Sequence, residues 1–235
     1  MIREFIEYWF TSSQPWGRAR GLVYESVAIG ARFRRQKKSW SQHLENSKKE
    51  IRNFVKTHSE CKRILVLGSG HLFDFPTDLF SQLPDVQFGL VDAVHPPSTS
   101  KWARQHSNLQ LIKQDIVYLW GQDSKVHITD WDLVISSCVA SQLPLSLSES
   151  EQRSCEIVQA HFENLKKSNK KFLIITDFRR HYLSQAKTAV RPPDDTVFGA
   201  PAVQNPKVEW NWDLAPIGEV SRDYSIQLTV GVWSS

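Results

Sequence analysis

The stretch Arg63-Ile64-Leu65-Val66-Leu67-Gly68-Ser69-Gly70-His71 is the most informative part of this chain. Its first five residues read as a buried apolar strand, which ends on Gly-x-Gly. A second apolar strand, Gly89-Leu90-Val91-Asp92, follows and ends on an acidic residue. Small residues at a strand end let the backbone approach a ligand, and a carboxylate ending the next parallel strand accepts hydrogen bonds from two ribose hydroxyls. The two strands together predict a nucleoside-binding site.

The same segment narrows the choice of ligand. A dinucleotide fingerprint needs a third glycine for tight helix packing beneath the pyrophosphate, and Phe73 stands at that position. NAD and FAD are therefore disfavoured. Pro76 is predicted to begin the following helix, so Asp74 either caps that helix or touches the ligand.

Strands and helices alternate from residue 61 onward, which requires a parallel sheet covered on both faces. The apolar runs predict strands at 64–67, 88–91, 109–112, 131–137 and 171–177. Helical spacing predicts helices at 3–10, 22–33, 40–57, 77–83, 99–106 and 150–167. The segment 191–195 reads as a loop, and the β-rich runs 208–212 and 225–232 read as an antiparallel hairpin.

This layout, with Gly68-Ser69-Gly70 and Asp92 at the first two strand ends, resembles the class I S-adenosylmethionine (SAM)-dependent methyltransferases. The resemblance implies an α/β fold with a doubly wound, mostly parallel seven-stranded sheet, an antiparallel C-terminal hairpin and N-terminal helices. It implies a helical cap or lid at 1–60 and a SAM-binding domain at 61–235, packed as one compact domain.

The resemblance also implies a set of cofactor-binding positions. Gly68 to Gly70 would approach the amino-acid part and ribose of SAM, Asp92 would bind the ribose hydroxyls, and Asp115 with Ile116 would contact adenine. Asp115 equally fits a cap of the short helix that follows it. The full set is Gly68, Ser69, Gly70, His71, Asp92, Ala93, Asp115, Ile116 and Ser137.

Catalytic residues are predicted in the segment 177–182, read as a loop overhanging the pocket. Asp177 or His181 would act as a base, and Arg179 or Arg180 would anchor an anionic substrate. A polar surface loop without catalytic function is the alternative. Gln14 to Arg18 is predicted to form a lid over the cofactor, and aromatic side chains such as Trp16 and Trp212 are candidates for stacking on a planar substrate.

Composition places the chain among ordinary globular proteins. It has 235 residues, of which 40% are hydrophobic and 23% charged, and no apolar run reaches the length of a membrane span. The three cysteines, Cys61, Cys138 and Cys155, are odd in number and lack metal-ligand spacing, which predicts no disulfide framework and no metal site. We therefore expect a soluble, cytoplasmic protein.

The net charge of +4 is unevenly distributed. Residues 1–63 contain 14 Lys and Arg against 6 Asp and Glu, and the remaining residues contain 15 against 19. The densest basic cluster is Arg32, Arg34, Arg35, Lys37 and Lys38. It fits a solvated helix face, or a surface that binds nucleic acid, an anionic membrane surface or an acidic substrate.

These features favour a SAM-dependent methyltransferase that acts by in-line displacement on a small molecule, either anionic or aromatic. An RNA methyltransferase that uses the basic helices is one alternative, and a non-catalytic methyltransferase-like scaffold is another. An NAD-dependent oxidoreductase is the least favoured. The Asn-Pro-Pro-Tyr signature of amino-methylating DNA enzymes is missing after the fourth strand, where Ser136-Ser137-Cys138-Val139 stands.

Overall fold

The fold is taken from a computed structural model that describes residues 2–121, 123–145, 147 and 150–235. The α-helices are α1 (Ile2–Phe10), α2 (Pro15–Ala19), α3 (Leu22–Thr57), α4 (Leu79–Gln82), α5 (Pro97–Gln105) and α6 (Glu151–Lys167). The strands are β1 (Ser12–Ser13), β2 (Arg63–Leu67), β3 (Gln87–Asp92), β4 (Val94–His95), β5 (Leu109–Lys113), β6 (Leu133–Ser137), β7 (Lys171–Leu183), β8 (Ala189–Asp195), β9 (Val208–Ala215) and β10 (Ser225–Ser234). Short 3-10 helices lie at η1 (Ile116–Tyr118), η2 (Ile128–Asp130), η3 (Ala140–Gln142) and η4 (Pro201–Val203).

The main sheet has the order β5-β3-β2-β6-β7-β10-β9. The five strands from β5 to β7 are parallel, and β10 is antiparallel to both of its neighbours. The chain builds outward from β2 through β3 to β5, then returns to the other side of β2 with β6. The carboxyl ends of β2, β3 and β6 therefore meet at the switch point, where open α/β sheets bind their ligands. The doubly wound fold with a C-terminal antiparallel hairpin is confirmed.

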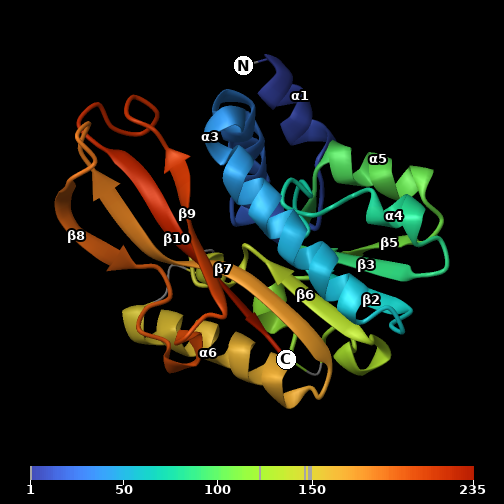
Figure 1. Ribbon diagram of the computed structural model, residues 1–235. Helices are drawn as coiled ribbons and strands as arrows, with labels where there is room; N and C mark the ends of the chain where they lie inside the picture. Colours follow the sequence, from blue (N-terminus) through green and yellow to red (C-terminus); the bar gives the residue numbers. More distant parts are fainter. Residues whose placement is uncertain (1, 122, 146, 148–149) are drawn as a thin grey trace.

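Helices cover both faces of the sheet. Apolar residues of α3, including Trp40, Ile51 and Phe54, pack on one face together with α4, and α6 packs on the other face through Val158 and Phe162 (Figure 1). The side chains of β2 alternate between the two cores, as the period of a strand dictates. No described helix combines the length and the apolar character that crossing a membrane requires.

The fifth predicted strand is longer than expected, and the sheet is larger. β7 continues from Lys171 to Leu183, paired with β10 on one side and with β8 on the other. The prediction of a loop at 191–195 is therefore wrong, and the sheet has eight strands rather than seven. Pro192 and Pro193 are compatible with this edge strand because they lie at a register shift opposite His181, where the regular pairing with β7 is interrupted.

The N-terminal helices differ from the prediction in continuity. A single helix of 36 residues, α3, replaces the two predicted at 22–33 and 40–57. Where the sequence predicts a break between two helices, α3 has a kink at Gln36, whose φ of −108° and ψ of 19° are not helical. The helix predicted at 77–83 is only α4, which begins after Asp78 and not at Pro76.

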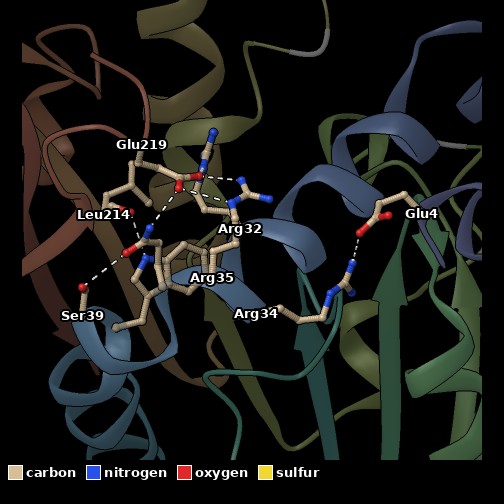
Figure 2. Close-up of polar contacts among 9 residues, drawn as sticks. Glu4, Arg32, Arg34, Arg35, Ser39, Leu214 and Glu219 are labelled. Atoms are coloured by element: carbon tan, nitrogen blue, oxygen red, sulfur yellow. Dashed lines mark hydrogen bonds and ion pairs between the residues drawn. The ribbon is translucent and has the colours of Figure 1, made fainter. Parts of the chain in front are cut away.

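Ion pairs hold the N-terminal helices in place (Figure 2). Arg34 of α3 pairs with Glu4 and Glu7 of α1, with N–O distances of 2.6 and 2.9 Å. Close to the kink, Arg35 contacts Glu219 of the β9–β10 loop at 2.6 Å, and Arg32 lies 3.7 Å from the same carboxylate. β1 pairs with β4, which attaches the segment before α2 to the chain just after Asp92.

Candidate functional site

The glycine loop after β2 needs glycine at its first position. Gly68 has a φ of +77°, and a Cβ there would lie 2.6 Å from the Cβ of Val139 and 3.0 Å from the carbonyl oxygen of Ser137. Gly70 also has a positive φ, +39°. The amides of Gly68 and Ser69 both donate to the carbonyl oxygen of Val91, at 3.0 and 3.2 Å, so the loop is fixed to the end of β3.

Asp92 lies beside this loop at the end of β3. Its Oδ2 accepts a hydrogen bond from the amide of Gly70 at 2.8 Å, and its Oδ1 accepts one from the amide of Val94 at 3.2 Å. Burial raises the pKa of Asp92 to about 6, against the opposing effect of these backbone hydrogen bonds. The structure thus brings together the two predicted parts of the nucleoside site.

Asp115 and Ile116 follow β5 at the same edge. The Oδ1 atom of Asp115 caps η1 by accepting from the amide of Val117 at 3.1 Å, and its Oδ2 forms an ion pair with Arg20, just after α2. Ile116 is buried and lines the cavity with its side chain. Both predicted functions of Asp115 remain compatible with this position, because it caps a helix and also borders the cavity.

Ser137 ends β6 and donates a hydrogen bond from Oγ to Asp74 Oδ2. Asp74 does not cap α4; its carboxylate faces β6 and lines the cavity. Ser136 points to the opposite face, where its hydroxyl lies 2.9 Å from His161 Nε2, in agreement with a structural function. Cys138 has a φ of +51°, and burial raises the pKa of its thiol well above the usual range, so the sulfur stays protonated.

These groups share one cavity of about 250 Å³. The glycine loop, Asp92 with Ala93, Asp115 with Ile116, and the end of β6 form one side. The first turns of α3, from Leu22 to Ile29, form another. All nine predicted cofactor-binding positions line this cavity, and the bulky residues that follow Gly70 do not fill it.

His71 serves as a link between this loop and α3. Its Nε2 lies 2.8 Å from the carbonyl oxygen of Ser26, which can only accept, so Nε2 carries the proton. Its Nδ1 lies 3.4 Å from the hydroxyl of Ser98. Burial lowers the pKa of His71, which keeps the imidazole neutral.

Sequence reasoning missed an aromatic side of the cavity. We call Trp40, His43, Phe73 and Trp212 the aromatic wall; all four line the cavity. His43 stacks on Trp212 with ring centroids 3.9 Å apart and planes 5° apart, and Trp212 meets Trp40 edge-on at 5.1 Å. The residue type of Trp212 makes it a candidate for stacking. Trp40 and His43, however, lie on α3, and no spacing in the sequence connects that helix to β9.

The predicted catalytic segment lies elsewhere. Residues 177–182 belong to β7 and not to an overhanging loop, because pairing with β8 and β10 keeps this polar segment extended. Asp177 is buried and accepts from Ser141 Oγ at 2.6 Å, and His181 Nε2 lies 2.9 Å from Thr229 Oγ1. Arg179 stacks over Phe178. Within the described part of the chain, the residues that line the cavity include none of Asp177, Arg179 and His181.

The described residues contain no group of three His, Cys, Asp or Glu side chains that could hold a metal ion. The cavity instead offers hydrogen-bonding groups. Ser69 is buried at the cavity wall, and its Oγ has no hydrogen-bond partner among the described residues. An unpaired buried hydroxyl is costly, and a polar ligand in the cavity would satisfy it.

Comparison with known proteins gives similarity in structure only. No protein-family model matches the chain, and no curated protein matches it in sequence. Among solved structures, it is similar to the 1,6-didemethyltoxoflavin N1-methyltransferase of Burkholderia thailandensis with bound 1,6-didemethyltoxoflavin and S-adenosylhomocysteine, at 15% identity over 94% of this chain and 91% of that chain, with a TM-score of 0.47.

Two further solved structures are similar over a smaller part. The plantazolicin methyltransferase BpumL in complex with S-adenosylhomocysteine is 13% identical over 63% of this chain and 52% of that chain, with a TM-score of 0.40. Human N-acetylserotonin methyltransferase in complex with SAM is 14% identical over 75% of this chain and 42% of that chain, with a TM-score of 0.34. At such identities and TM-scores, the function has to be inferred from the site itself.

Proposed function

We propose that this protein is a SAM-dependent methyltransferase that moves the methyl group of SAM to a small-molecule acceptor by in-line displacement. The observation that carries the proposal is the contact between the glycine loop and Asp92, at 2.8 Å, inside a cavity at the switch point of a doubly wound sheet. A carboxylate held there accepts hydrogen bonds from ribose hydroxyls, while the glycine loop admits the ligand close to its backbone.

The residues of the cavity fit this cofactor. Ile116 offers an apolar surface for adenine, Asp92 offers a carboxylate for ribose, and Ser69 offers an unpaired hydroxyl. When bound, SAM supplies a methyl group activated by its sulfonium. The protein's contribution is to hold the acceptor in line with that group and to exclude water, which is mainly a matter of alignment.

A dinucleotide fits the same site poorly. The pyrophosphate of NAD rests on the N-terminus of the helix that directly follows the glycine loop. Here α4 begins only at Leu79 and has four residues, so no helix N-terminus lies behind Gly70. Among the described residues, the lining of the cavity also includes no lysine or arginine to meet a phosphate.

The structure also weakens the case for RNA. Three members of the basic cluster, Arg32, Arg34 and Arg35, make ion pairs within the protein, to Glu219 and to the carboxylates of α1 (Figure 2). Lys37 and Lys38 stay exposed. Arginines engaged with carboxylates have less capacity to neutralise a phosphate backbone.

We also propose that residues 1–60 act as the lid of the site. The first turns of α3 line the cavity, and Arg20 reaches across to Asp115. The pairing of β1 with β4 holds this segment against the residues that follow Asp92. A ligand therefore has to enter the cavity between this segment and the carboxyl edge of the sheet.

Calorimetric titration of the full chain with SAM and S-adenosylhomocysteine (SAH) tests the proposed activity. We expect both to bind, and Asp92→Ala to weaken SAH by at least about tenfold, since charge-assisted hydrogen bonds contribute about 1.5–3 kcal/mol. Asp78→Asn is the control, because Asp78 pairs with Arg52 at the surface, outside the cavity. A folded protein that binds neither ligand would be a scaffold, and preferential binding of NADH would make it an oxidoreductase.

A further inference from the structure

The proposed cofactor leaves one part of the cavity without a function. The glycine loop, Asp92 and Ile116 account for the parts of SAM, but the aromatic wall and Asp74 line the same cavity beyond Ser137. Ser137 connects the two regions, since its hydroxyl donates to Asp74 at the end of β6. An acceptor bound in this second region would lie beside the proposed cofactor.

The aromatic wall is uncharged, and two of its rings, His43 and Trp212, are parallel to within 5°. His43 accepts a hydrogen bond at Nδ1 from Trp210 Nε1 at 3.1 Å, and an indole nitrogen can only donate. The proton of His43 therefore sits on Nε2, which faces Cys138 Sγ at 3.8 Å. Burial lowers the pKa of His43 to about 3, so the ring is neutral at ordinary pH. Such a surface suits the face of another aromatic ring.

The charges around this region are negative. The carboxylates that line the cavity belong to Glu25, Asp74, Asp92 and Asp115. Asp115 is paired with Arg20, and Asp92 is held by backbone amides. Asp74 accepts from a neutral hydroxyl and forms no ion pair with any residue that the structure describes. A carboxylate without a counter-ion in a cavity disfavours an anionic ligand and favours a cation or an N–H donor.

We infer that the methyl acceptor is a small amine built on a flat aromatic ring, with its basic nitrogen on a short side chain. Its ring stacks on the aromatic wall, and its nitrogen donates a hydrogen bond to Asp74. This inference rests on the proposed function and specifies its substrate. Of the two kinds of acceptor that the sequence suggested, it selects the aromatic one and not the anionic one.

The chemistry balances with the groups present. The lone pair of the uncharged amine forms the new N–C bond while the C–S bond breaks, and the bonding electrons stay on sulfur as the thioether of SAH. The methylated nitrogen gains one positive charge as the sulfonium loses its own. An amine that binds as its ammonium first gives one proton to Asp74, so its nitrogen is uncharged when it attacks. Asp74 later passes that proton to water, and the methylated product leaves as an ammonium.

One competing assignment has to be separated from this one. Asp74 would also suit the ammonium group of SAM itself, since SAM and SAH share that group. If Asp74 binds the cofactor, its removal weakens SAH. If it binds the acceptor, its removal leaves SAH binding intact and weakens only the amine.

The test uses the full chain and three ring-matched probes. SAH is titrated first, which tests the proposed function alone. Tryptamine, indole and indoleacetate are then titrated into the SAH-saturated protein. We expect tryptamine to bind about tenfold or more tighter than indole, as a charge-assisted hydrogen bond allows, and indoleacetate to bind more weakly than indole.

Two variants and a control complete the test. Asp74→Asn is expected to abolish the preference for tryptamine over indole while SAH affinity changes by less than about twofold. Trp212→Leu is expected to weaken tryptamine and indole alike by about tenfold, through loss of stacking, with retained SAH binding as the check that the protein is folded. Asp78→Asn, on the same segment but outside the cavity, is expected to behave as the wild type.

The outcomes separate the two proposals. Absence of SAH binding by the wild type overturns the proposed function. SAH binding with indoleacetate equal to or tighter than tryptamine overturns the aromatic-amine inference alone. A loss of SAH affinity in Asp74→Asn that equals its loss of tryptamine affinity assigns Asp74 to the cofactor, and likewise overturns the inference.

Discussion

Among single residues, Gly68 is the most restricted by its surroundings. Its φ of +77° is unfavourable for any residue with a side chain. A Cβ atom at this position would also overlap with the side chain of Val139. Gly199 has a similar φ of +71°, but nothing lies within 4 Å of its Cβ position. Alanine substitutions at the two positions therefore distinguish the cost of backbone strain, which both share, from the cost of steric overlap, which only Gly68 has.

We predict that Gly68→Ala destabilises the protein more than Gly199→Ala. The second substitution should cost about 1–2 kcal/mol, the usual penalty for a left-handed alanine. The first adds the overlap with Val139 at 2.6 Å and pushes apart the ends of β2 and β6. Urea unfolding of both variants measures the difference, and SAH binding should be lost only in Gly68→Ala. Equal stabilities would show that the loop moves freely.

Asp92 should make cofactor binding depend on pH. Its pKa of about 6 means that below pH 6 the carboxyl takes up a proton and loses an acceptor for ribose. SAH affinity is expected to rise with pH up to about 6 and then level off, with a limiting slope of about tenfold per pH unit. Burial lowers the pKa of the neighbouring His71, so its ring gains a proton only at lower pH than a free imidazole would. Calorimetry between pH 5 and pH 8 measures the profile, and Asp92→Asn should flatten it.

Local sequence predicted one half of the site and not the other. Gly68, Gly70 and Asp92 each end a strand, so their position follows from the strand pattern and the parallel sheet. Trp40 and Trp212 meet only because α3 packs on β9, and no local pattern encodes that contact. The prediction of a loop at 177–182 was wrong because the polar residues there are typical of a loop, while pairing on both sides makes them a strand.

Among the secondary-structure elements, α3 has the widest effect on the site. Its first turns line the cofactor region, and Trp40 and His43, beyond the kink at Gln36, line the aromatic region. Glu219 holds the helix beside this kink through Arg35 and Gln36 (Figure 2). The sequence predicted the break between two helices but not that one continuous helix spans it, since spacing alone does not distinguish a kink from a loop.

Cofactor binding should protect the segment between β1 and α3 from proteolysis. Arg18 and Arg20 provide trypsin sites there, and Arg20 pairs with Asp115 across the cavity. A ligand below the segment is expected to reduce its opening, so SAH should slow cleavage at both sites several-fold. Lys187, exposed in the turn between β7 and β8, serves as the internal control, and its cleavage should not change. Unchanged cleavage at Arg18 and Arg20 would contradict the lid.

At the scale of the whole molecule, the protein buries several imidazoles in its two cores. Burial lowers the pKa of His43 to about 3 and those of His95 and His161 to about 4. In the unfolded chain these groups titrate near 6.5. Each one therefore stays neutral in the folded protein over a pH range in which the unfolded chain gains a proton.

We predict that stability falls as the pH drops from about 6.5 towards 4, where the unfolded chain binds more protons at these three histidines. Asp92 and Asp177 have raised pKa values and act in the opposite direction, so the net slope should be smaller than the roughly 4 kcal/mol per pH unit that three histidines alone would give. Urea unfolding at several pH values measures it. His161→Gln should reduce the slope by about 1.4 kcal/mol per pH unit, the contribution of one histidine. The control His127→Gln, at an exposed position, should leave it unchanged.

The contact of α3 with β9 also matters during synthesis of the chain. The ribosome releases α3 long before Val208–Ala215, yet Trp40 donates its indole N–H to the carbonyl of Leu214, at 2.9 Å, and packs on Trp212. Part of the apolar side of α3 therefore stays uncovered until the last quarter of the protein has been synthesised. A nascent chain stalled before residue 208 presents that side to chaperones or to other nascent chains.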